Sequence, residues 1–240
     1  MKKQQNKEGI DIVKEVKRDD FIHKIKEIDD LSWKEAYDIV HEFCYLDIKL
    51  DLNEIKQILC FKDKDLVDLF LREYILFDKD DRVYLELFIN DNLEHENTEF
   101  VSDLLYFACD LSLNIDYLRV MSLIDSHVQD ENYVVLGALN YISTNVKYYY
   151  INEIFSTMRK VINSEKYYQS EQILASVILY RISNKTEYLI FIKELLLADE
   201  GNILFLTNLL KEEAYQEEYF NIKVFKEHLS MLNYNSNNQW

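Results

Sequence analysis

Carboxylates are the residues of this sequence best able to do chemistry, because the chain carries 44 Asp and Glu residues against 27 Lys and Arg. They are densest between residues 78 and 99, where eight acids accompany two bases. The run 78–82, DKDDR, superficially resembles a calcium-binding loop, which needs oxygen ligands at its fifth and twelfth positions and glycine at its sixth. Those positions hold Arg82, Ile89 and Val83. The sequence therefore predicts no EF-hand.

Histidines and cysteines show no spacing typical of a metal or redox site. No two of the five histidines lie three or four residues apart, and Cys44, Cys60 and Cys109 stand far apart in apolar segments. We expect these cysteines to be buried, reduced thiols. Nucleophile-elbow and metalloprotease motifs are absent, and no glycine pair can cradle a phosphate. We therefore expect no enzyme, cofactor or metal, and an enzyme whose site assembles only in three dimensions stays as an alternative.

The negative charge is concentrated in the middle of the chain. Residues 35–135 hold eight basic and 24 acidic residues, a net charge of −16, whereas the whole chain carries −17. Such a segment repels phosphates and anionic lipids, so we expect no binding to nucleic acid or membranes. Two interpretations remain open: a solvated surface that only aids solubility, and a docking face for a basic protein.

The docking interpretation assigns candidate partner-binding residues. The acidic face consists of carboxylates between residues 80 and 99: Asp80, Asp81, Glu86, Asp91, Glu94, Glu96 and Glu99. A second part of the groove combines acids with tyrosines, which are common interface anchors: Asp116, Tyr148, Tyr149 and Glu153. The alternative for the 18 tyrosines is that they bridge core and water, and that an AT-rich genome encodes many of them.

Apolar residues recur at helical spacing along almost the whole chain, as in Phe100, Leu104, Phe107 and Leu111. Turn-rich β folds are disfavoured because the chain has no proline and three glycines. The pattern predicts an all-α fold with helices at 10–28, 32–48, 51–60, 64–77, 81–91, 98–112, 114–127, 130–143, 146–163, 168–183, 185–198, 201–213 and 216–232.

Side-chain caps are predicted at several of these helix starts. Capping boxes are expected at Ser32 with Glu35, Asp51 with Glu54, and Asn184 with Glu187. Single caps are expected at Asn114, Asp130 and Ser170.

Residues 134–155 align with 174–195 at an offset of 40: Val134 matches Leu174, Leu139 matches Leu179, and Ile142-Ser143 matches Ile182-Ser183. Helix pairs repeated at this period resemble HEAT or armadillo units. The resemblance implies a solenoid-like stack of antiparallel helix pairs, with a compact helical bundle as the alternative. We expect one domain at 9–232, with irregular helices at 9–97 and HEAT-like pairs at 98–232, between disordered residues 1–8 and frayed residues 233–240.

The N-terminus lacks the apolar run of a secretory signal, and no segment is apolar enough to span a membrane, so a cytoplasmic protein is expected. As a small, acidic chain, this protein is similar to bacterial immunity proteins. That resemblance implies neutralisation of a basic, nuclease-type toxin by occlusion. The alternative is a HEAT-like scaffold or regulator with an endogenous protein partner.

Overall fold

The computed structural model describes residues 16–46, 48–129 and 131–211, together with Phe225, Glu227 and Ser230. Every regular element in those residues is a helix, so the predicted all-α class is confirmed. The termini predicted to be disordered or frayed lie outside the described residues, as does nearly all of the helix predicted at 216–232. Within the described part of the chain, no helix has both the length and the apolar character needed to cross a bilayer.

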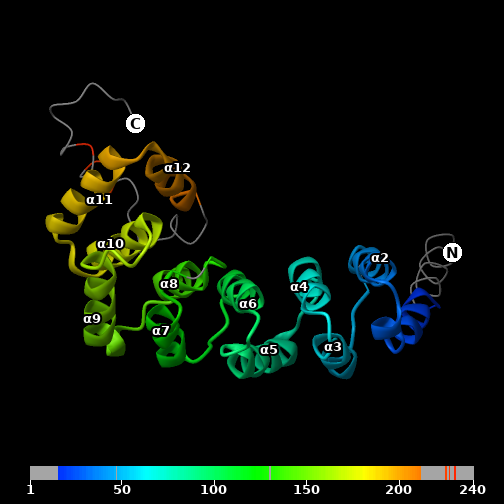
Figure 1. Ribbon diagram of the computed structural model, residues 1–240. Coiled ribbons are helices and arrows are strands. Elements are labelled where there is room, and N and C mark those ends of the chain that lie inside the picture. Colours follow the sequence, from blue (N-terminus) through cyan, green and yellow to red (C-terminus); the bar gives the residue numbers. More distant parts are fainter. Residues whose placement is uncertain are drawn as a thin grey trace, which may run out of the picture. The chain divides into compact units, whose positions relative to one another are not determined.

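The chain divides into two compact units, residues 1–95 and 96–240. One domain was predicted, with a change of character between residues 97 and 98, which is two residues from this division. Figure 1 follows the helices of the first unit from blue to cyan and green. They are residues 16–25, η1 (Ile28–Asp30), α2 (Trp33–Cys44), α3 (Leu52–Leu59), α4 (Lys64–Glu73) and α5 (Lys79–Asn92).

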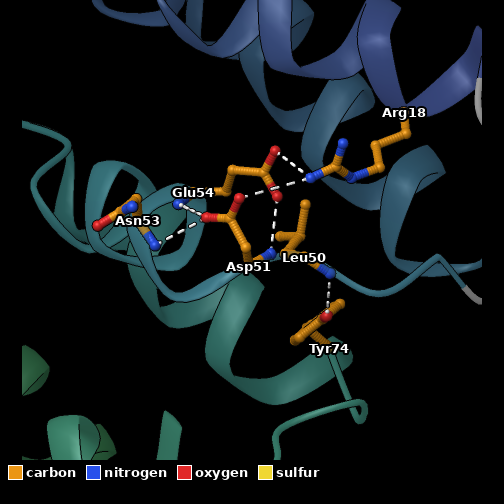
Figure 2. A network of polar contacts seen from close by, with 6 residues as sticks. All are labelled: Arg18, Leu50, Asp51, Asn53, Glu54 and Tyr74. Atoms are coloured by element: carbon orange, nitrogen blue, oxygen red, sulfur yellow. Dashed lines mark hydrogen bonds and ion pairs between the residues drawn. The ribbon is translucent and has the colours of Figure 1, made fainter. Parts of the chain in front are cut away.

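In the first unit, α2 and α3 both pack against α4, and α3 also contacts α5. A polar network ties the helix at 16–25 to the start of α3 (Figure 2). The Arg18 guanidinium lies 2.5 Å from Glu54 Oε1 and 3.7 Å from Asp51 Oδ2. Both acids also form the capping box of α3. The link between two helices and the start of α3 therefore depend on the same carboxylates.

The second unit contains the remaining helices: α6 (Thr98–Asp110), α7 (Tyr117–Ser126), α8 (Val134–Thr144), η2 (Tyr148–Tyr150), α9 (Ile151–Ile162), α10 (Gln169–Ser183), α11 (Thr186–Ala198) and α12 (Glu200–Leu209). Here α6 packs against α8, and α8 against α10. Helix α7 contacts both α8 and α9, and α9 in turn packs against α10. Each of these helices thus meets its neighbour in sequence or the next but one.

Helices α6 and α8 approach each other closely at Gly137. A Cβ placed on Gly137 of α8 would lie 3.3 Å from the Cβ of Leu105 on α6. Glycine therefore lets the two helices approach closely here. The contact fixes how α6 lies along the first turn of α8.

The predicted capping boxes at Ser32 and Asp51 are confirmed. The box at Asn184 is wrong, because Asn184 ends α10 in the left-handed conformation with φ 54°. Asparagine favours this role at a helix C-terminus, where its short polar side chain tolerates positive φ. The cap predicted at Asn114 is also wrong, because Asp116 caps α7 two residues later. The cap predicted at Ser170 is wrong because Ser170 lies inside α10. Asp130 lies outside the described residues.

Candidate functional site

A hollow of about 390 Å³ opens on the second unit between α6 and the approach to α8. It is lined by Glu99, Ser102, Asp103 and Tyr106 from α6 and by Glu131, Asn132, Tyr133 and Leu136 from the α8 side.

The α6 wall follows from helical geometry. Glu99, Asp103 and Tyr106 are spaced i, i+4 and i+7, so they share one face of α6. The opposite wall is the segment 131–133, and the side-chain amide of Asn132 donates to Thr98 Oγ at 2.6 Å. This bond ties the segment to the first residue of α6.

Tyr133 stands at the start of α8 in an unusual conformation. Its backbone is left-handed, with φ 62° and ψ 24°, and its side chain makes no capping hydrogen bond. A bulky residue in this region is strained, typically by about 1–2 kcal/mol. Tyr133 is nevertheless 59% exposed. The strained backbone thus presents an aromatic ring to solvent at the rim of the hollow.

The hollow gathers negative charge beside aromatic rings. Glu99, Asp103 and Glu131 contribute three carboxylates, and none of the described lining residues is basic. Tyr106 and Tyr133 add ring faces, which attract cations. A lysine ammonium or an arginine guanidinium is the chemical group that this arrangement suits.

Glu99 is the predicted partner-binding residue that lies in the hollow. Glu96 is exposed three residues earlier in the same unit. The others of the predicted acidic face belong to the first unit. Asp80, Asp91 and Glu94 are exposed there, and Glu86 is half-buried. Asp80 and Asp91 are eleven residues apart, about three turns, and so share a face of α5.

The prediction that Asp81 binds a partner is wrong, because only 3% of this residue is exposed. Its carboxylate accepts from the backbone N–H of Asp78 at 2.8 Å and completes the capping box of α5. Burial raises its pKa. Asp78 itself is paired with Lys49 at 2.5 Å, which lowers its pKa to about 2. Two acids of this run therefore serve the start of α5, and Asp81 is removed from the binding surface.

The second predicted group lies near the starts of α7 and α9. Asp116 caps α7 by accepting from two backbone N–H groups. Tyr148 and Tyr149 are exposed in η2, and Glu153 is exposed in the first turn of α9. The stacked rings of Tyr117 and Tyr150, 5.5 Å apart, join α7 to η2. Lys147 is also present, with its Nζ 2.5 Å from Asn114 Oδ1. A cation is thus part of this tyrosine-rich region, in contrast to the hollow.

Sequence reasoning missed Asp103, Tyr106, Glu131 and Tyr133 as site residues. Helical spacing could have identified Asp103 and Tyr106, because they continue the face of Glu99 along a correctly predicted helix. No sequence pattern identifies Glu131 and Tyr133 as site residues, because their position depends on how α8 packs against α6.

The cysteines differ from expectation. They form no disulfide, but Cys60 is exposed, and Cys44 and Cys109 are only half-buried. Burial raises the pKa of the Cys44 thiol to about 12. Among the described side chains, no group of three His, Cys, Asp or Glu residues is placed to hold a metal ion.

Comparisons with protein-family models, with curated proteins and with solved structures gave no match for this chain.

Proposed function

We propose that this protein is a protein-binding module that receives a basic side chain of its partner in the hollow between α6 and α8. The observation that carries the proposal is the grouping of Glu99, Asp103 and Glu131 with two tyrosines, with no basic residue among the described lining residues. Carboxylates grouped in a concave site favour a cation and steer its approach.

We infer further that the helices form a HEAT-like stack of antiparallel pairs. In support, α6, α8 and α10 contact one another in turn, while α7 and α9 contact both this row and each other. Stacked helix pairs offer extended surfaces that suit macromolecular partners.

Within this class, our proposal is an immunity protein that occludes a basic, nuclease-type toxin. A net charge of −17 complements a protein that binds nucleic acid. The acidic chain would occupy the surface on which such a toxin binds phosphates. Inhibition by occlusion requires no catalytic residue in the inhibitor.

The test starts with capture of partners on the tagged chain, elution with increasing salt, and identification by mass spectrometry. The captured partner is then purified, and its nuclease activity is titrated with the chain. We expect a basic protein whose activity falls to zero at one equivalent. A stoichiometric partner without nuclease activity would instead favour the scaffold function.

The hollow is tested with the triple variant Glu99→Gln, Asp103→Asn, Glu131→Gln. We expect the Kd for the partner to rise at least about tenfold, because charged pairs at interfaces are typically worth more than 1.4 kcal/mol in total. The matched control is Glu165→Gln, Glu187→Gln, Glu194→Gln, which removes the same charge from exposed positions of the same unit. Equal losses in both variants would contradict a specific role for the hollow.

A further inference from the structure

The first unit carries a continuous row of aromatic rings on α2. Trp33, Tyr37, His41 and Tyr45 follow one another at intervals of four residues. Successive ring centroids lie 5.1, 5.5 and 4.9 Å apart. At 1.5 Å per residue the row extends about 18 Å along the helix. We call these four residues the α2 aromatic row.

The row is not part of the hydrophobic core. The buried residues of α2 are Ala36, Val40 and Phe43, whereas Trp33 is 52% and Tyr45 70% exposed. Tyr37 and His41 are half-buried between them. Large aromatic side chains in water are informative, because folding alone gives them no reason to be there. A row of them is typical of a contact surface.

Carboxylates border the row. Asp38 is exposed three residues before His41, so the two are neighbours on the helix. On the α4 side, Glu73 Oε1 lies 3.8 Å from His41 Nε2. Residues 16–46 and 48–95 together contain 20 acidic and 12 basic residues, a net charge of −8. The surroundings therefore favour a cationic partner.

We propose that the α2 aromatic row binds an arginine-rich, extended segment of a partner protein. A guanidinium stacks on aromatic faces and pairs with carboxylates, and it does both better than an ammonium. Neighbouring rings of the row are about 6 Å apart along the helix axis. Alternate side chains of an extended chain are about 6.6 Å apart, so arginines at every second position match the row. Nucleic-acid bases also stack on aromatic rows, but their phosphates need a basic groove, whereas this row has the carboxylates of Asp38 and Glu73 beside Lys34.

Trp33 allows a local test that does not depend on the hollow. The chain has two tryptophans, Trp33 and Trp240, so Trp240→Phe leaves Trp33 as the sole reporter. The probe is a blocked peptide of four arginines alternating with serines. We expect this peptide to change the Trp33 emission in a saturable way. A peptide with lysine in place of each arginine has the same charge and should bind with a Kd about fivefold higher. No change in Trp33 emission would overturn the proposal, whether or not the hollow binds its partner.

Two variants then distinguish the contribution of the aromatic rings to peptide binding from that of the negative charge. Tyr37→Leu with Tyr45→Leu keeps apolar side chains and should raise the Kd about tenfold. The control is Val83→Ala with Leu87→Ala, an exposed apolar pair on α5, and we expect no change. Asp38→Asn is a surface change that leaves the fold intact, and it should weaken binding more than Asp65→Asn.

The remaining outcomes are equally decisive. Equal affinity for the arginine and lysine peptides would mean binding by charge alone, and would overturn the role of the rings. Tighter binding of decathymidylate than of the arginine peptide would overturn the proposed partner in favour of nucleic acid.

Discussion

At the scale of single residues, Tyr133 combines a strained backbone with an exposed ring, and the two can be separated. Tyr133→Gly removes the ring and relieves the left-handed strain, while it increases the entropy of the unfolded chain. These effects oppose each other, so we expect the free energy of unfolding to differ from that of the parent protein by less than about 1 kcal/mol. Partner affinity should fall, as measured by titration calorimetry with the captured protein.

Tyr133→Phe is the control, because it keeps the ring and removes only the hydroxyl. It should retain most of the affinity. If Tyr133→Gly binds as tightly as the parent, the ring has no part in the site. If it unfolds the unit, the residue is structural and the strain serves the fold.

Glu171 gives a second prediction, for pH dependence. It is 1% exposed and accepts from the backbone N–H of Tyr168 at 2.8 Å. Burial raises its pKa from 4.5 to about 7, although that hydrogen bond opposes the shift. Between pH 4.5 and 7 the folded state then binds more protons than the unfolded state, so the contribution of Glu171 to stability falls as pH rises.

Glu171→Gln keeps an acceptor for Tyr168 and removes the buried charge. We expect variant and parent to be similarly stable at pH 5, and the advantage of the variant to grow by about 2–3 kcal/mol between pH 5 and pH 8. Urea denaturation at both values measures the difference, in which the other titrating groups cancel. If the stability of the variant relative to the parent falls between pH 5 and pH 8, the raised pKa is contradicted.

At the scale of elements, buried tyrosine hydroxyls hold the connections between helices. The Tyr141 hydroxyl accepts from Ile115 N–H at 3.0 Å and donates to the Leu113 carbonyl at 2.9 Å. It thus binds the turn between α6 and α7 from within α8. In the first unit, the Tyr74 hydroxyl accepts from Leu50 N–H at 2.8 Å. Part of the tyrosine abundance therefore has a structural function.

Tyr141→Phe leaves both backbone groups buried without their partner. We expect it to lower the free energy of unfolding by about 2 kcal/mol, because each unsatisfied buried group costs about 1 kcal/mol or more. Urea denaturation measures the loss. Tyr148→Phe removes an exposed hydroxyl and should change stability by less than about 0.5 kcal/mol. Similar values for the two would show that water satisfies the turn.

Most helices were predictable from sequence because they bury an apolar stripe that repeats at helical period, as α2 and α9 do. Helices α8 and α10 are instead buried on almost every side. The predicted range 51–60 exceeds α3 by one residue at each end, and the range 98–112 begins with α6 and ends two residues after it. Caps were less predictable, since Asn184 fits a helix start as well as the left-handed end that it forms. The site was predicted only at Glu99, because its other wall follows from the docking of α6 and α8 around Gly137, which no local pattern encodes.

At the scale of the whole molecule, the division at residue 95 implies that each unit has its own core and its own stability. Arg18 is the residue best placed to test this. It pairs with Glu54, whose side chain is 11% exposed. Removing one partner leaves a nearly buried carboxylate uncompensated, which typically costs a few kcal/mol.

Arg18→Met should therefore weaken the first unit by about 2–3 kcal/mol and leave the second unchanged. Hydrogen exchange read by mass spectrometry resolves the two, because peptides from residues 16–95 and 98–209 report separately. We expect faster exchange in the first set only. Adding Glu54→Gln, which removes the uncompensated charge and keeps an acceptor for Asp51 N–H, should restore part of the protection. Faster exchange in both sets would mean that the two units unfold as one, and that binding at the α2 aromatic row and at the hollow is thermodynamically linked through folding.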